Sequence, residues 1–170
     1  MKNLNIGLFG FDCVGQGLFE TLNKSKNFGG VIKKICIKNP DKKRKLSSEL
    51  FTTDKNEIIN DPSIDIVVEL IDDANAAYHI VVNSLKAGKP VVTANKKMVA
   101  EHLEELVELQ DETGQALLYE GAVCASIPII RTLEEYFNHE PLNEIKGIFN
   151  GSTNYILTKV FTRVWITQKP

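Results

Sequence analysis

The 170-residue sequence lacks several features, and each absence excludes a class of protein. No apolar run approaches the ~20 residues that a membrane-spanning helix needs. The first residues, Met1–Asn5, carry no signal-peptide core, so we expect neither a membrane protein nor a secreted one. A net charge of −2 argues against nucleic acid as the main partner, because binding to a phosphate backbone requires a basic surface.

Cysteine is scarce as well. The three cysteines, Cys13, Cys36 and Cys124, are odd in number and widely spaced, which is typical of reduced thiols rather than of disulfides or a metal cage. We therefore expect a cytoplasmic protein. Apolar residues make up 43% of the chain and charged residues 25%, as in an ordinary globular protein. The length allows one domain with a real core but not two large ones.

Short apolar segments alternate with segments of helical spacing along the chain. The predicted strands are Leu4–Phe9, Val31–Ile37, Ile64–Leu70, Val91–Thr93, Ala116–Glu120 and Glu144–Phe149. The predicted helices are Cys13–Asn23, Ala74–Lys86, Met98–Thr113 and Ile127–Phe137, with a helical turn at Glu57–Asn60. Such alternation indicates βαβ units, whose right-handed crossovers place helices on both faces of the sheet. The predicted fold class is α/β, a doubly wound, Rossmann-like, mainly parallel sheet.

A glycine-rich turn follows the first predicted strand, in the segment Gly10-Phe-Asp-Cys-Val-Gly15. The dinucleotide-binding pattern Gly-x-Gly-x-x-Gly uses its first glycine for a tight turn and its second for close approach to the pyrophosphate. Its third glycine packs the following helix. Gly10 and Gly15 fill the first and third places. Cys13 and Val14 begin the following helix, whose N terminus offers amides to the phosphates of a dinucleotide.

Asp12 occupies the second position of this pattern. Its side chain crowds the pyrophosphate, and its carboxylate adds repulsion between like charges. We therefore expect weakened cofactor binding, and tighter binding after Asp12→Gly. In an alternative interpretation Asp12 caps the following helix, which is compatible with a Rossmann turn.

The end of the second predicted strand bears on the choice of cofactor. In proteins that bind NAD, an acid ~20 residues beyond the glycine loop binds the ribose hydroxyls. Here Lys38 occupies the strand end, and the basic run Lys42-Lys-Arg-Lys45 follows. These cations favour the 2′-phosphate of NADP over NAD, although a basic run is also typical of a solvated loop.

The segment Val91-Val-Thr-Ala-Asn-Lys-Lys97 is the most informative in the chain. A β-branched strand ends there in a polar turn, directly before a helical run. Because ligands bind outside the carboxyl ends of parallel strands, Lys96 is placed to reach a bound ligand. A single lysine on a solvent loop is, however, more often structural.

Five segments together resemble the amino-terminal half of the homoserine dehydrogenase family. They are Ile6–Gly17, Asp65–Ile71, Ala87–Lys97, Glu120–Arg131 and Asn150–Lys159, and the last three in this order are specific. The resemblance implies NAD(P)-dependent interconversion of L-homoserine and L-aspartate 4-semialdehyde, on the way to threonine and methionine. It also implies an NAD(P)-binding domain at residues 1–149, the start of a substrate and dimerisation domain at residues 150–170, and a homo-oligomer.

The resemblance implies roles for individual residues. Lys96 corresponds to an active-site lysine that helps with proton transfer or polarises the reacting oxygen. Thr93 and Asn95 then line the nicotinamide side. Glu120, with the backbone near Val123 and Ala125, resembles the family's site for a monovalent cation such as sodium. Glu120 fits equally well as an ordinary acid at the end of a strand.

The sequence departs from the family's pattern in several places. Asp72 and Asp73 stand where the family often has two glycines, and Cys124-Ala-Ser126 replaces a glycine-rich stretch. The family's Asp-x-x-Gly-x-Asp-x-x-x-Lys run, with its second catalytic lysine, is not found in these 170 residues. We therefore expect this chain alone to turn over homoserine poorly or not at all.

Two other interpretations of the sequence compete with this one. A nucleophilic Cys124 needs a nearby base, and His79, His102 and His139 form no motif around it, so a buried thiol is favoured. The chain is alternatively a non-catalytic nucleotide-binding fragment or an oligomerisation module. In that case the apolar residues between Tyr155 and Trp165 predict self-association.

Overall fold

The computed structural model describes residues 4–25, 29–124 and 127–167, with side chains up to residue 162. Two compact units make up the chain, Met1–Tyr119 and Glu120–Pro170. The strands of the first unit are β1 (Leu4–Phe9), β2 (Gly30–Cys36), β3 (Phe51–Thr52), β4 (Ile66–Glu69), β5 (Val91–Thr93) and β6 (Leu117–Leu118). Its helices are α1 (Cys13–Lys24), α2 (Asn56–Ile59), α3 (Ala74–Lys86) and α4 (Lys96–Thr113), with a 3-10 turn η1 (Ser48–Leu50).

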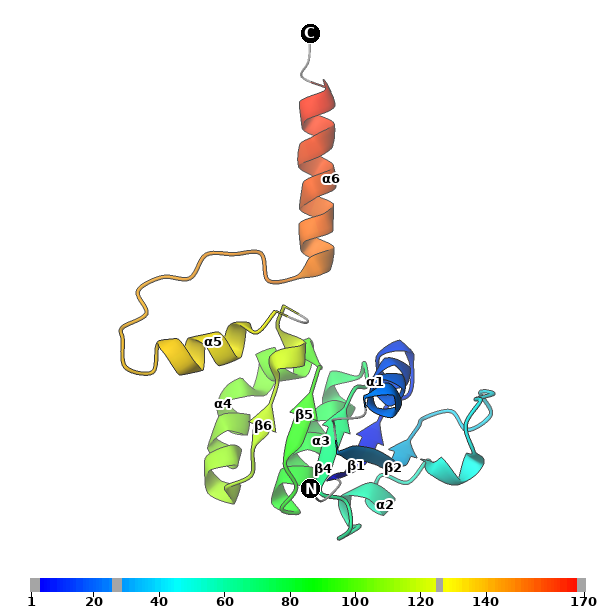
Figure 1. The fold of residues 1–170 in the computed structure, drawn as a ribbon. Helices are drawn as coiled ribbons and strands as arrows, with labels where there is room; N and C mark the ends of the chain where they lie inside the picture. Colours follow the sequence, from blue (N-terminus) through cyan, green and yellow to red (C-terminus); the bar gives the residue numbers. More distant parts are fainter. Residues whose placement is uncertain (1–3, 26–28, 125–126, 168–170) are drawn as a thin grey trace. The chain divides into compact units, whose positions relative to one another are not determined.

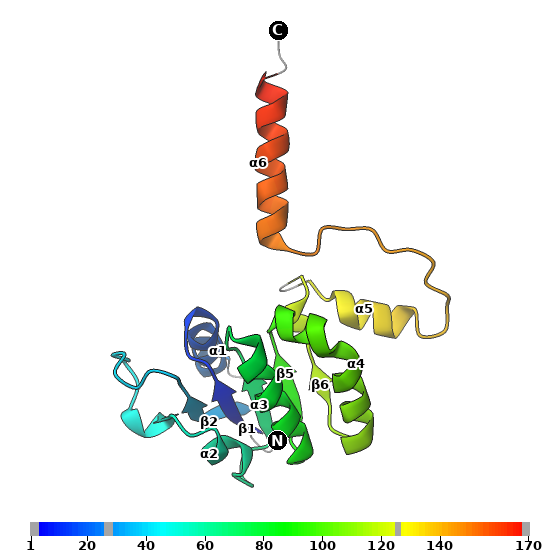
Figure 2. The same cartoon turned by 180° about the vertical axis from the view of Figure 1, so that it is seen from behind.

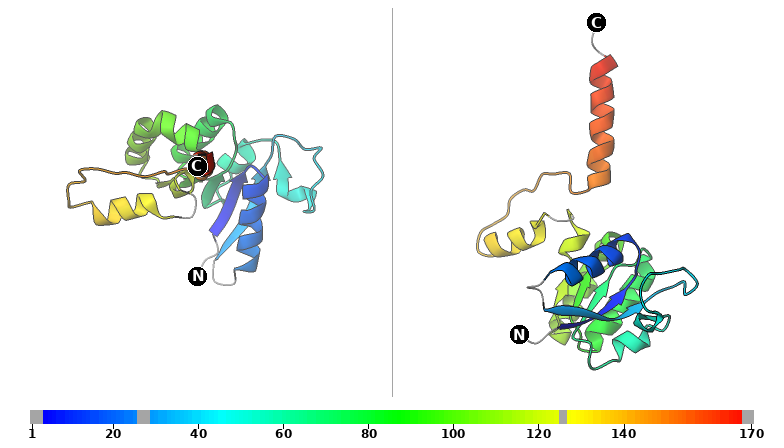
Figure 3. Two further views of the ribbon diagram at one scale, coloured as in Figure 1. Left: turned by 90° about the horizontal axis from the view of Figure 1, so that it is seen from above. Right: turned by 45° about the vertical axis from the view of Figure 1, so that its right-hand side comes forward.

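The six described strands form one parallel sheet in the order β3-β2-β1-β4-β5-β6. Helix α1 covers one face, and α3 and α4 lie side by side on the other (Figures 1 and 3). Figure 2 shows the sheet from behind, with α4 next to β6. The predicted α/β class, the parallel sheet and the helices on both faces are therefore confirmed.

The central strands are buried on both faces, which explains their nearly continuous apolar sequence. Ile6, Leu8 and Ile35 join one buried cluster, against which Leu18 and Phe19 of α1 pack. At the carboxyl end of each strand the chain leaves this core and enters a loop. These loops position the polar residues considered below.

The second unit contains the 3-10 turn η2 (Glu120–Ala122), α5 (Ile129–Tyr136) and α6 (Gly151–Thr167). Asn150 caps α6, since its Oδ1 accepts a hydrogen bond from the Thr153 amide at 2.9 Å. None of the helices in the described part of the chain combines the length and apolar character needed to cross a bilayer.

One predicted strand is wrong. Residues 141–150 contain neither helix nor strand, although Glu144–Phe149 includes the apolar residues Ile145, Ile148 and Phe149. Such a segment forms a strand only where a neighbouring strand completes its hydrogen bonds, and the described residues provide none here. The two-residue edge strand β3 and the helix α6 were not predicted.

Candidate functional site

A cavity of about 630 Å³ opens at the carboxyl ends of β1, β2 and β4. The chain passes from β1 to β2 and β3 on one side, and then returns to β4 on the other side of β1. This reversal of strand order is the point at which open parallel sheets bind their ligands. The polar lining comprises Asp12, Lys38, Asn39, Lys42, Arg44, Thr53, Asp72 and Asp73.

The turn after β1 requires its two glycines. Gly10 has a φ of +91°, and a Cβ there would lie 2.7 Å from the carbonyl oxygen of Leu70. A Cβ on Gly15 would collide with the carbonyl oxygen of Gly10, because α1 packs directly on the turn. Both positions thus have the roles that the fingerprint gives to its first and third glycines.

Asp12 lies at the N-cap position of α1, but its side chain makes no capping hydrogen bond. The capping interpretation is therefore wrong for the side chain. Its Oδ1 instead accepts a hydrogen bond from Lys42 Nζ at 2.5 Å. This ammonium lowers the pKa of the Asp12 carboxyl, so the carboxylate is ionised and paired.

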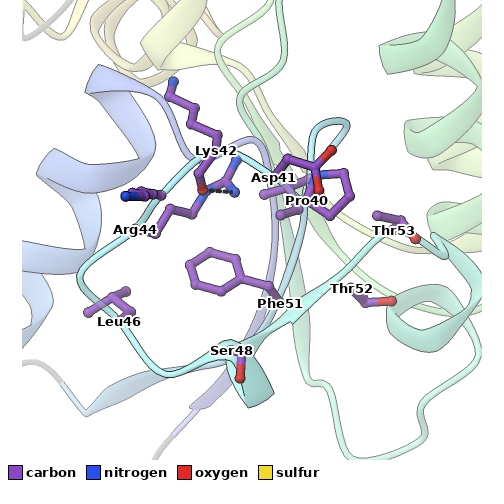
Figure 4. A pocket seen from close by; sticks show the side chains of 11 residues that line it. Pro40, Asp41, Lys42, Arg44, Leu46, Ser48, Phe51, Thr52 and Thr53 are labelled. Carbon is purple, nitrogen blue, oxygen red and sulfur yellow. Dashed lines mark hydrogen bonds between the residues drawn. The ribbon is translucent and has the colours of Figure 1, made fainter.

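The loop after β2 forms a second, adjoining cavity of about 500 Å³ (Figure 4). The guanidinium of Arg44 lies 5.2 Å from the centre of the Phe51 ring, and its Nη1 donates to the carbonyl oxygen of Lys42 at 2.8 Å. These contacts hold the backbone of Lys42 in place. Arg44 Nε is buried and has no hydrogen-bond partner in the part of the chain that the structure describes.

The ends of β4 and β5 are joined by a buried carboxyl group. Glu69 is 0% exposed, and its two oxygens accept hydrogen bonds from Thr93 Oγ1 at 2.5 Å and the Ile71 amide at 2.6 Å. Asn95 Nδ2 donates to the Ile71 carbonyl oxygen at 2.9 Å, which closes the network between the two loops. Burial raises the pKa of Glu69.

Lys96 is the first residue of α4 and is exposed. Asn95 caps this helix, since its Oδ1 accepts from the Met98 amide at 3.0 Å. The buried Glu69 network therefore sets the position from which the lysine side chain extends. Thr93 and Asn95 are 0% and 7% exposed, and their side chains are used in these internal hydrogen bonds.

The structure brings together some of the predicted site residues. Gly10, Asp12 and Lys38 line the larger cavity, whereas the lining does not include Cys13, Val14, Gly15, Thr93, Asn95 or Lys96. Sequence reasoning did not single out Lys42, Arg44 or Glu69. The basic run includes Lys42 and Arg44 but does not distinguish them from their neighbours. No pattern in the sequence indicates the role of Glu69.

Glu120, proposed for a cation site, caps a helix in the structure. Its Oε1 and Oε2 accept hydrogen bonds from the amides of Ile130 and Arg131 at 3.1 and 2.9 Å. The Val123 amide donates to the backbone oxygen of Glu120, and Ala125 lies outside the described residues. The carboxylate therefore stabilises the start of α5, and these two amides use part of its capacity to accept hydrogen bonds. Asp73 likewise caps α3, since its Oδ1 accepts from the Ala76 amide at 3.0 Å.

A crevice at the switch point of a parallel sheet, behind a glycine turn, places the chain among doubly wound, Rossmann-like domains. The family model described as "Homoserine dehydrogenase, NAD binding domain" matches residues 10–120, and the model described as "Homoserine dehydrogenase" matches residues 128–167. The chain belongs to the homoserine dehydrogenase family.

Individual relatives agree with this assignment. Homoserine dehydrogenase of Bacillus subtilis is 37% identical over 169 residues, covering 94% of this chain and 39% of that protein. The crystal structure of the Thiobacillus denitrificans enzyme matches with a TM-score of 0.79 at 35% identity, covering 92% of this chain and 38% of that one. The S. aureus enzyme at pH 7.5 matches with a TM-score of 0.63 at 38% identity, over 72% of this chain and 33% of that one. The chain thus spans about two fifths of the relatives that it matches.

Proposed function

We propose that this chain is the dinucleotide-binding part of a homoserine dehydrogenase, an NAD(P)-dependent oxidoreductase that interconverts L-homoserine and L-aspartate 4-semialdehyde. The observation that carries the proposal is the cavity at the switch point, bordered by the Gly10 turn and a basic loop. The reaction belongs to threonine and methionine biosynthesis, and we place it in the cytoplasm. The domain limits 1–149 and 150–170 and the homo-oligomer remain part of this proposal.

The residues present fit a nicotinamide dinucleotide. Gly10 and Gly15 allow the tight turn after β1, which places the first residues of α1, Cys13 and Val14, next to Asp12 at the cavity. When bound, the nicotinamide supplies the site at which a hydride is gained or lost. The protein's part is to bind, orient and exclude water.

We propose NADP as the preferred dinucleotide. Lys38 and Arg44 line the cavity at the end of β2, where the ribose of the adenosine half binds in this fold. The buried Nε of Arg44, without a partner among the described residues, is a donor that a 2′-phosphate oxygen can satisfy. The positions of Lys38 and Arg44 support the proposed preference more specifically than the basic run alone.

The catalytic role proposed for Lys96 is to act on the reacting oxygen and its proton, and not on the hydride. Its ammonium extends from the first turn of α4 at the carboxyl end of β5, the edge at which the sheet binds its ligand. There it donates a hydrogen bond to the reacting oxygen and stabilises the charge that develops on it. Thr93 and Asn95 contribute by holding this turn through the Glu69 network. The monovalent-cation site at Glu120, Val123 and Ala125 stays part of this proposal, with no step of the reaction assigned to it; the Glu120 carboxylate also accepts two amides at the start of α5.

Calorimetric titration of the purified chain with NADPH and NADH tests this function. We expect saturable binding, tighter for NADPH, and little turnover of homoserine by the 170-residue chain alone. Arg44→Met should weaken NADPH binding more than NADH binding, because it removes a cation beside the 2′-phosphate as well as the hydrogen bond that holds the Lys42 backbone. If a folded chain binds neither dinucleotide, the proposed function is wrong for this chain. Normal turnover with homoserine would contradict the expectation of low activity.

A further inference from the structure

The Asp12–Lys42 ion pair lies where the fold expects a glycine and a phosphate. Asp12 precedes α1 in the glycine turn, so the ammonium of Lys42, 2.5 Å from Asp12 Oδ1, lies at the pyrophosphate end of the crevice. The two side chains come from loops separated by 30 residues in the sequence. They meet because the turn after β1 and the loop after β2 lie at the same edge of the sheet.

The backbone of Lys42 is held in place, whereas its side chain is exposed to solvent. Arg44 holds the Lys42 backbone through its hydrogen bond to the carbonyl oxygen, and the Phe51 ring holds Arg44. The Lys42 and Asp12 side chains are nevertheless 52% and 76% exposed. An exposed ion pair is weak, so its partners exchange readily for a better ligand.

We propose that Lys42 is a pyrophosphate ligand, which Asp12 keeps over the crevice until a dinucleotide binds. This inference rests on the proposed binding of a dinucleotide. The ammonium then exchanges the Asp12 carboxylate for the pyrophosphate, whose two phosphates carry one negative charge each and together accept several hydrogen bonds. A glycine at the second position would let the backbone approach the pyrophosphate closely. With Asp12 in that position, Lys42 supplies the attraction instead. Asp12 competes for this cation and lowers affinity without abolishing it.

A double-mutant cycle tests the assignment. NADH and NADPH are titrated into the wild-type chain, Asp12→Gly, Lys42→Met and the double variant, with circular dichroism to confirm folding. We expect Lys42→Met to weaken binding roughly three- to tenfold in both backgrounds, as loss of an exposed charged contact does. The effect should be equal for NADH and NADPH, because both carry the pyrophosphate. Asp12→Gly alone should tighten binding, and less so at high salt.

Lys45→Met is the matched control, because Lys45 is exposed in the same loop and lines neither cavity. An effect of Lys42→Met only in the presence of Asp12 would overturn the inference, since Lys42 would then merely neutralise that acid. Tighter binding in Lys42→Met would overturn the inference as well, because the ion pair would then block the dinucleotide rather than help to bind it. A loss for NADPH alone would reassign Lys42 to the 2′-phosphate. If neither wild type nor Asp12→Gly binds a dinucleotide, the proposed function fails together with the inference.

Discussion

Single residues in the glycine turn show what a local pattern can predict. The spacing of Gly10 and Gly15 from β1 identified their roles, because each role depends on backbone within a few residues. The environment of Asp12 was not predictable in the same way. Its partner Lys42 is 30 residues away, and only the parallel pairing of β1 with β2 brings their loops together.

Two glycines of α1 should respond to alanine in opposite directions. Gly15→Ala should lower the free energy of unfolding by about 1–3 kcal/mol, because its Cβ would press on the Gly10 carbonyl oxygen. Gly17→Ala meets nothing within 4 Å and should raise the free energy of unfolding by about 0.5–1 kcal/mol through better helix propensity. Urea unfolding of both variants measures the difference. Shifts of the same sign would show that α1 does not pack on the turn as described.

At the scale of elements, the junction of β4 and β5 depends on Glu69. Glu69→Ala should lower the free energy of unfolding by about 2–4 kcal/mol, because it leaves the Ile71 amide and Thr93 hydroxyl without their acceptor and opens a cavity. Glu69→Gln keeps the length and one acceptor and should remain close to wild type. Urea unfolding measures both variants. A small effect of alanine would mean that the two loops are held by other contacts.

The same carboxyl predicts a pH dependence of stability. The pKa of Glu69 is raised in the folded protein by burial, so the folded state binds this proton more readily than the unfolded chain. Its stabilising contribution is therefore fully present below the ordinary carboxyl pKa and is lost as the pH rises through the raised value. Thermal unfolding from about pH 4 to about pH 8 should show Glu69→Gln gaining on wild type as the pH rises. Parallel curves would contradict this prediction.

Elements with strong local signals were predicted well. The helix Ala74–Lys86 and the strand Val91–Thr93 were predicted with the bounds that the structure gives them, because apolar spacing and flanking turn residues agree there. The edge strand Phe51–Thr52 has too few residues to show a period. Glu144–Phe149 is apolar enough for a strand but has no neighbouring strand among the described residues. The buried Glu69 network could not be predicted from the sequence for a related reason, because it joins residues from separate strands.

At the scale of the whole molecule, α6 predicts self-association. Tyr155, Ile156, Val160 and Phe161 are 63%, 59%, 51% and 65% exposed, which is unusual for large apolar side chains. Analytical ultracentrifugation should show an apparent mass that rises with concentration. Ile156→Lys should reduce the association. Thr162→Lys, which also introduces a lysine into α6, should reduce the association less. A monomer at all concentrations would contradict the prediction.

The strand order also predicts which strands of the sheet open first and which open last. Because β1 pairs with both β2 and β4, it belongs to both halves of the sheet, while β3 and β6 are two-residue edges. Parallel neighbours cannot close through short hairpins, so the distant pairing of β1 with β4 is entropically costly and forms slowly. Amide hydrogens of β3 and β6 should accordingly exchange with solvent first, and those of β1 and β4 last, only when the whole sheet opens. The glycine turn and the end of β4 extend from β1 and β4, so we expect this side of the crevice to keep its shape while the edge strands open.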